Sequence, residues 1–236
     1  MQKGFVSEYF HTYNRGVEKR KVFLDKGDFL RGVHDLYEFN DVERVVGFNR
    51  RKNQSVGYPI SDKGRKKEKE LLIDIIAWCL IPNHYHLFSA EKQYGALSKF
   101  QQKFGIGFTN YFNLKHKRSG VLFQGKHKKV HVSSDAQAAH LICYIHSNQL
   151  DLWKSKWKEG GLTSLEIKSA LKFLQDRKNR WSSHQDYWGI QNFPSLISKE
   201  FLSNFFGGIQ GYREFFVNWL KQYKNNAKII DGIMID

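Results

Sequence analysis

The sequence predicts an α+β fold in which an antiparallel sheet carries helices, and three observations support this class. Short β-prone runs alternate along residues 8–150 with longer stretches whose apolar residues recur every three or four positions. One run, LLIDIIAWCLI at 71–81, is almost continuously apolar, as a buried central strand would be. Pro82 and Asn83 then form a turn signal, so we expect residues 84–90 to return as the antiparallel neighbour of that strand.

The remaining elements follow in a regular order. Residues 8–16 form a β-prone run that ends in the turn signal Arg15-Gly16, which predicts a first strand closed by a turn. Apolar spacing predicts helices over 28–39, with Asp28 as the N-cap, and over 95–115. Between these helices and the end of the domain we expect a short strand pair within 120–132 and a helix over 136–149, capped by Ser133 or Ser134.

Two domains are expected along the chain. Residues 1–152 would form the first and larger domain, with a polar and basic loop inserted at 41–70. Residues 153–236 would form a small helical C-terminal appendage, since helical spacing returns at 163–177 and near 212–223. The 41–70 loop is interpreted either as solvated surface or as a segment that contacts DNA.

Composition favours a folded protein that binds a polyanion. The 236 residues contain 38 Lys and Arg against 23 Asp and Glu, which gives a net charge of +15. Aromatic residues make up 15% of the chain, and nucleic acid suits this combination because bases stack on rings while cations contact phosphates. The alternative is a basic globular protein with no such ligand.

The two cysteines, Cys79 and Cys143, exclude a disulfide framework and a four-thiolate zinc site. Residues 1–8 have no apolar signal-peptide core, and no apolar run is long enough to span a bilayer. We therefore expect a cytoplasmic, nucleoid-associated protein with no membrane partner.

His84 and His86 are the first candidate metal ligands. Side chains two residues apart in a strand project to the same face, so both imidazoles can reach one divalent ion, while Tyr85 points to the other face. The alternative is a pair of strand-end histidines without a ligand.

Tyr144 and Asn148 are the candidates on the helix over 136–149. Four residues apart, they share one helix face with His140, whereas Gln149 lies about 140° from Tyr144. Tyr144 could act as a nucleophile, although a phenol needs help from a cation or a base at neutral pH. The Asn148 carbonyl could join the histidines around Mg²⁺ or Mn²⁺, and imidazoles also accept Zn²⁺.

Several motifs together resemble the HUH endonuclease superfamily, and within it the REP-associated tyrosine transposases, which act on single-stranded DNA. The motifs are YFHTYNRG at 9–16, VFLDKGDF at 22–29, LIPNHYHLF at 80–88, LFQGKHKKVHV at 122–132, YIHSNQ at 144–149 and WSSHQDYWG at 181–189. The chain departs from the family pattern where Gln149 replaces a common proline, which keeps Gln149 as a minor candidate for the third metal ligand.

The resemblance implies a ferredoxin-like α+β domain with an antiparallel sheet and helices on one face. It implies that His84, His86 and Asn148 hold Mg²⁺ or Mn²⁺ and that Tyr144 attacks a single-strand DNA phosphate. The products would be a 5′-phosphotyrosine link and a free 3′-hydroxyl, so that the strand can later be rejoined without ATP. Insertion-sequence members of the family work as dimers and REP-associated members as monomers, so the resemblance leaves open whether this chain forms a homodimer.

Basic residues near these motifs are the candidates for contacting single-stranded or hairpin DNA: Arg15, Lys117, Arg118, Lys126, Lys128 and Lys129. Alternatives to a transposase are a non-catalytic hairpin-binding relative, a metal-dependent hydrolase that uses water, and a nicking enzyme of the replication-initiator or relaxase type.

Overall fold

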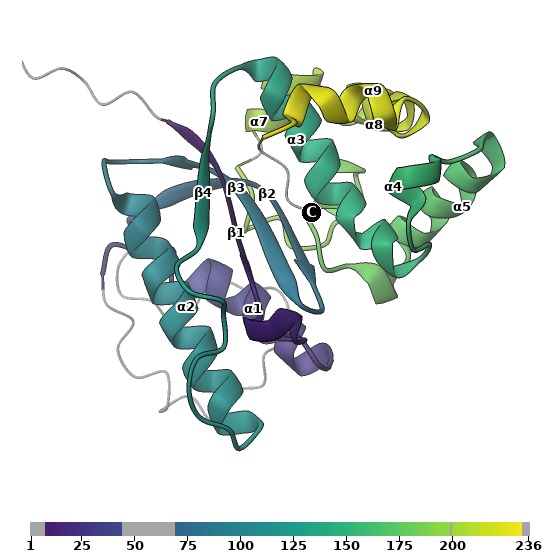
Figure 1. The fold of residues 1–236 in the computed structure, drawn as a ribbon. Helices are drawn as coiled ribbons and strands as arrows, with labels where there is room; N and C mark the ends of the chain where they lie inside the picture. The colour runs from purple at the N-terminus through teal and green to yellow at the C-terminus, as the bar shows by residue number, and fades with distance from the viewer. Residues whose placement is uncertain (1–7, 44–68, 199, 233–236) are drawn as a thin grey trace, which may run out of the picture.

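A four-stranded antiparallel sheet forms the centre of the protein, as seen in a computed structural model that describes residues 8–43, 69–198 and 200–232. The strands are β1 (Tyr9–Arg15), β2 (Ile73–Ile81), β3 (His84–Glu91) and β4 (Lys128–Val132). They lie in the order β2-β3-β1-β4, with β3 and β1 in the middle. This confirms the α+β class (Figure 1).

The β2–β3 hairpin follows the sequence pattern closely. β2 is buried along almost its whole length, as expected for a continuous apolar run, and only the two residues Pro82 and Asn83 separate it from β3. The carbonyl oxygen of Pro82 accepts hydrogen bonds from the backbone N–H groups of Val22 (2.7 Å) and Phe23 (3.0 Å). The turn is thereby fixed to the segment that leads into the first helix.

Helices α1 (Lys26–Glu38) and α2 (Ala96–Lys115) cover one face of the sheet (Figure 1). The apolar stripe of α2 is core, as predicted: Phe100, Phe104 and Phe108 are fully buried. A Cβ on Gly107 would lie 2.2 Å from a ring carbon of Phe39, so glycine is required for the close packing of the two segments.

The N-cap of α1 is Asp25, and the prediction of Asp28 was wrong. The Asp25 carboxylate accepts the backbone N–H of Asp28 (3.0 Å), while the Asp28 carboxylate reaches back to the N–H of Leu24 (2.9 Å). Both residues suit the first turn of a helix. The two hydrogen bonds explain why α1 begins at Lys26, three residues before the start that an N-cap at Asp28 predicts.

Helix α3 (Asp135–Ser147) packs on the opposite face of the sheet, and Ser134 is its N-cap. The predicted strand pair within 120–132 is reduced to β4, which pairs with β1, and to an isolated bridge between Gly16 and Phe123. The C-terminal helices lie beside α3 (Figure 1): α4 (Trp157–Gly160), α5 (Ser164–Gln175), α6 (His184–Tyr187), α7 (Glu200–Phe206), α8 (Ile209–Lys221) and α9 (Tyr223–Ala227). Short 3-10 turns occur at Val17–Lys19, Asn148–Leu152, Arg177–Asn179 and Lys228–Ile230.

The segment around Ser182 lies along the outer edge of β2. Leu80 donates its N–H to the carbonyl of Trp181 (2.8 Å), and Ser183 donates to the carbonyl of Trp78 (3.0 Å). Leu174 and Phe216 from the C-terminal helices belong to the same apolar core as α3. The residues after 152 are therefore packed with the sheet and α3, and the division at 152/153 stays a prediction.

Most of the predicted 41–70 loop lies outside the described residues. None of the helices that the structure describes is both long enough and apolar enough to cross a membrane.

Candidate functional site

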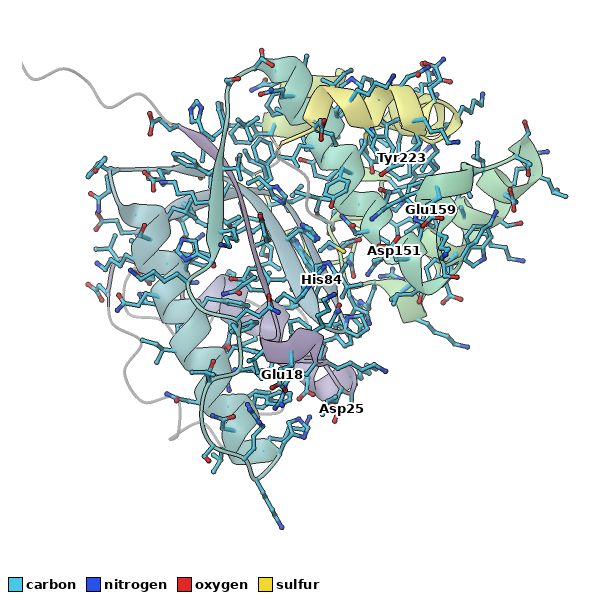
Figure 2. The ribbon with its side chains drawn as sticks, in the orientation of Figure 1. Glu18, Asp25, His84, Asp151, Glu159 and Tyr223 are labelled. Atoms are coloured by element: carbon cyan, nitrogen blue, oxygen red, sulfur yellow. The ribbon has the colours of Figure 1, made fainter. Side chains whose placement is uncertain are left out.

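His84 and His86 occupy the face of the sheet that packs against α3. Cα pairing places His86 opposite Tyr13 and Cys79, and His84 opposite Arg15 and Ile81. Directly paired residues share a face, so both imidazoles project to the same side, and their ring centroids are 4.9 Å apart. In Figure 2, His84 is labelled at the end of β3 that lies toward the C-terminal helices.

Tyr85 faces the other side of the sheet, as the alternation predicts. Its hydroxyl donates a hydrogen bond to Oε1 of Gln101 (2.7 Å) on α2, and Gln101 in turn donates to Thr12 (2.7 Å). Burial raises the pKa of the Tyr85 phenol, which therefore stays protonated and belongs to the α2 side of the core.

His11 is a third imidazole at this site, and it was missed in the sequence. Its Nε2 lies 3.1 Å from Nδ1 of His86, and the two rings are stacked with centroids 5.3 Å apart. The signal was present, because His11, Tyr13 and Arg15 alternate along β1 and must share a face. His11 fixes the orientation of His86, as carboxylates and carbonyls fix metal-binding histidines in other proteins.

The hydrogen bonds of both candidate ligands engage Nδ1 and leave Nε2. Nδ1 of His84 lies 2.7 Å from Oδ1 of Asn83, and Nδ1 of His86 is held by His11. Nε2 of His86 is buried and has no hydrogen-bond partner among the described residues. A buried nitrogen without a partner is costly unless a ligand occupies it.

Both histidines are neutral at physiological pH, which is the form that binds metals. Burial, followed by the positive charges of Arg15 and Lys158, lowers the pKa of His84 to about 3. Burial likewise holds the pKa of His86 well below its usual value, with further contributions from His84, His11 and Lys158. A neutral imidazole has one nitrogen lone pair that it can offer to a metal.

Helix α3 brings Tyr144 onto the same site. Its ring is 1% exposed and lies edge-on to His86, with centroids 5.6 Å apart, and edge-on to His11 at 6.3 Å. His140, one turn earlier, instead packs its ring against Phe215 (5.3 Å) and does not join the site.

The Asn148 amide is held in one orientation at the end of α3. Its Nδ2 donates to the carbonyl oxygen of Tyr144 (2.9 Å), which leaves Oδ1 as the atom available to a cation. Gln149 points elsewhere: its Oε1 accepts a hydrogen bond from Oγ of Ser182 (3.4 Å). The structure therefore places Asn148, and not Gln149, beside Tyr144.

Lys158, which no sequence motif indicated, completes the site from α4. Its Nζ lies 3.0 Å from Oδ1 of Asn148, 3.0 Å from Oδ2 of Asp151, and 5.3 Å from the centroid of the Tyr144 ring. The name histidine–tyrosine site is used below for this set: His11, His84, His86, Tyr144, Asn148 and Lys158.

The donor set partly fits the implied metal. Among the described residues, no group of three or more His, Cys, Asp and Glu side chains is arranged to hold an ion. Two imidazole Nε2 atoms and the Asn148 oxygen would be the ligands, a mixed set that leaves positions open for substrate. The free, buried Nε2 of His86 supports the fit, whereas the contact of Lys158 with Asn148 opposes it.

The basic residues predicted to contact DNA differ in how they are engaged. Arg15 lies opposite His84, next to the site, and Lys117, Lys126 and Lys128 are exposed. Lys129 is paired with the buried carboxylate of Glu91 (3.2 Å). The guanidinium of Arg118 is bound to Asn113 and to the carbonyl of Val121.

Comparisons with known proteins give little beyond this geometry. No protein-family model matches the chain, and no curated protein matches it. A solved structure of a REP-associated tyrosine transposase bound to a REP hairpin aligns over 84% of this chain and 90% of that chain, with a TM-score of 0.42 and 10% sequence identity. A similarity this low assigns no role to any residue, so the function is argued from the site itself.

Proposed function

We propose that this protein is a metal-dependent endonuclease and strand transferase for single-stranded, hairpin-flanked DNA, in which Tyr144 is the nucleophile. The observation that supports it most is the position of Tyr144, which lies between His86, Asn148 and Lys158. A phenol with neutral imidazoles on one side and a cationic group on the other would be suited to attack on a phosphodiester.

In the proposed reaction, Oη of Tyr144 forms a bond to phosphorus and the bond from phosphorus to the 3′-oxygen breaks. The phenol loses its proton and the leaving 3′-oxygen gains one, which gives the 3′-hydroxyl. The reverse reaction rejoins the strand. Arg15 and Lys158 would stabilise negative charge on the phosphate oxygens. His84, His86 and Asn148 would hold Mg²⁺ or Mn²⁺, which supplies Lewis-acid polarisation of the phosphate when bound.

The burial of Tyr144 sets a condition on this reaction. With 1% of the residue exposed, the side chains packed around its ring, Lys158 among them, must move before a phosphate can reach the hydroxyl. The same burial favours a second candidate function, that of a hairpin-DNA-binding protein in which the site no longer reacts.

A covalent-adduct assay distinguishes the two. The protein is incubated with single-stranded hairpin oligonucleotides of varied sequence, labelled at the 3′ end, with Mn²⁺ or Mg²⁺, and resolved on a denaturing gel. We expect a slow-migrating adduct with the wild type and with the control Tyr94→Phe, whose side chain lies at a 92% exposed position. Tyr144→Phe and the double variant His84→Ala/His86→Ala should give none.

DNA binding without an adduct for any hairpin would reject the strand-transferase proposal in favour of the binding protein. Metal-dependent cleavage that persists in Tyr144→Phe would point instead to a hydrolase that uses water.

A further inference from the structure

We propose that Lys158 and the divalent ion compete for Oδ1 of Asn148, so that the Lys158 ammonium is a resident cation which must leave the amide before a metal binds. This inference rests on the proposed function, because it concerns the same metal site. It identifies a residue of this chain that controls metal occupancy.

The first support is the geometry of the amide. Because Nδ2 of Asn148 is committed to the carbonyl of Tyr144, Oδ1 is the atom that faces the site, and Lys158 takes it at 3.0 Å. An ammonium and a divalent ion cannot both be ligated by this oxygen without strong repulsion between their charges.

The second support is the position of Lys158 against the Tyr144 ring. Its Nζ lies 5.3 Å from the centroid of that ring, and the centroid of the His86 ring lies 5.6 Å from the same centroid. The ammonium and the proposed metal ligands are therefore gathered around one side chain.

The third support is that Lys158 has a second partner to which it can withdraw. Nζ also lies 3.0 Å from Oδ2 of Asp151, whose other oxygen accepts the indole N–H of Trp157 (2.8 Å). When Lys158 leaves Asn148, it loses a hydrogen bond to a neutral acceptor but keeps its ion pair with Asp151. The exchange is therefore inexpensive, and a metal of ordinary affinity can drive it.

The test measures binding of Mn²⁺ itself, by isothermal titration calorimetry, to the full chain without DNA. Lys158→Gln should bind Mn²⁺ about tenfold or more tightly than wild type, since one repelling charge has been removed. Lys158→Arg, which keeps the charge, should stay close to wild type. Lys154→Gln is the matched control, because Lys154 pairs with Glu166 (2.5 Å) and its loss changes net charge equally.

Equal or weaker Mn²⁺ binding by Lys158→Gln, with a wild type that binds, would overturn the competition and leave the proposed function standing. Tightening to the same extent in Lys154→Gln would also overturn it, because the effect would then come from net charge. Absence of Mn²⁺ binding in every variant, or binding that survives His84→Ala/His86→Ala, would reject both the competition and the metal site of the proposed function. Thermal unfolding of each variant confirms that it is folded.

Discussion

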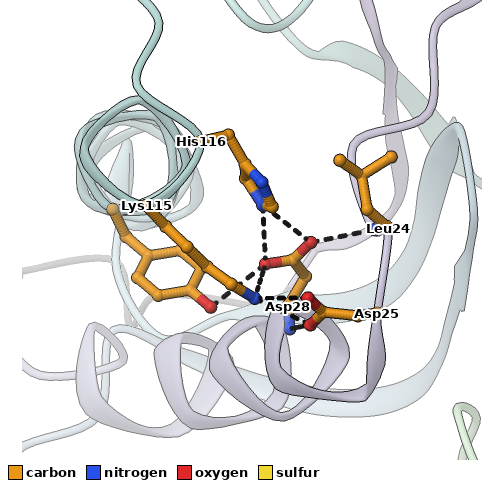
Figure 3. Close-up of polar contacts among 6 residues, drawn as sticks. Leu24, Asp25, Asp28, Lys115 and His116 are labelled. Carbon is orange, nitrogen blue, oxygen red and sulfur yellow. Dashed lines mark hydrogen bonds and ion pairs between the residues drawn. The ribbon is translucent and has the colours of Figure 1, made fainter.

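Two buried polar clusters in this protein differ in whether their polar atoms find hydrogen-bond partners within the fold. At the junction of α1 and α2, Asp28 is fully buried and every carboxylate oxygen has donors (Figure 3). At the histidine–tyrosine site, a buried imidazole nitrogen has no hydrogen-bond partner among the described residues, and a cation lies on a neutral amide.

The Asp28 cluster is complete without any ligand. Lys115 (2.7 Å) and His116 (3.1 Å) lie within bonding distance of Asp28, which also accepts from the hydroxyl of Tyr111 (3.1 Å). Burial raises the pKa of Asp28, but the bonds from Lys115, Leu24 and His116 outweigh it and hold that pKa below its ordinary value. The carboxylate is therefore ionised and structural.

The contrast teaches which buried polar groups to associate with chemistry. A charge whose bonding capacity is used up within the fold contributes to stability and has little left to offer a substrate. A buried polar atom that lacks a hydrogen-bond partner destabilises the fold, and such an atom indicates a ligand or a reaction. The predictions that follow test this distinction between the two clusters.

The largest expected effect is on covalent chemistry. Tyr144→Phe should reduce adduct formation by at least about 10³-fold while changing the free energy of unfolding by less than about 1 kcal/mol, because only a hydroxyl is removed. Gel quantification and urea unfolding measure the two. A variant that loses stability and activity together would place Tyr144 with the structural cluster.

His11→Ala should weaken Mn²⁺ binding by about 10- to 100-fold, the usual cost of losing the group that orients a metal-binding histidine. Calorimetric titration gives the affinity. His131→Ala serves as the control, since His131 is exposed on β4, away from His86. Unchanged affinity in His11→Ala would show that His86 does not depend on its neighbour.

Acid should destabilise the protein through buried histidines before it reaches Asp28. His146 and His184 both lie within bonding distance of the Tyr212 hydroxyl (2.7 and 2.8 Å). Burial lowers the pKa of His184 to about 3 and that of His146 well below its usual value. In the unfolded chain these histidines are protonated below about pH 6.5, whereas in the folded protein they stay neutral. The free energy of unfolding therefore falls as the pH drops below that value.

Urea unfolding at pH 7.5, 6.5 and 5.5 measures this loss, which should approach about 1.4 kcal/mol per pH unit for each such histidine. His184→Gln should remove one histidine's share of the slope. The lowered pKa of Asp28 acts at the opposite end: its contribution is present above its unfolded pKa near about 3.9 and is lost below it. A slope that begins only below pH 4.5 would contradict the histidine assignment.

The smallest effect on covalent chemistry and metal binding is expected at the Asp28 cluster. Asp28→Asn should lower the free energy of unfolding by about 2 kcal/mol at pH 7, because charged hydrogen bonds are lost while Lys115 keeps Asp25 (2.7 Å) as a partner. Asp74→Asn, which breaks an exposed pair with Lys92, should cost less than about 1 kcal/mol. Adduct formation and Mn²⁺ affinity should be unchanged in Asp28→Asn, and a loss of either would break the distinction between the clusters.

Local pattern was enough to predict the order of elements and four of the six residues of the site. The apolar run at 71–81 and the turn at Pro82 specified the central hairpin, and strand alternation placed His84 and His86 on one face. Helical spacing put Tyr144 and Asn148 together in the same way. These features depend on neighbours in sequence, which is why they can be read from it.

The remaining contacts depend on tertiary packing that no local period encodes. Lys158 reaches Asn148 because a 3-10 turn and a short helix redirect the chain after α3. The segment around Ser182 pairs with β2 without an alternating pattern of its own, and no strand was predicted there. His11 could have been found by applying to β1 the alternation that was applied to β3.

The segment around Ser182 also decides how this sheet can meet other chains. Strand β2 is an outer strand of the sheet, and its backbone groups from Trp78 to Leu80 are already paired with residues 181–183. Within the described part of the chain, strand addition is thus left to the β4 side, where Lys128 and Lys129 lie on a short strand. Lysines on a short edge strand disfavour pairing with a second sheet. The protein is therefore protected against edge-to-edge aggregation by residues 181–183 along β2 and by the charge of the lysines on β4.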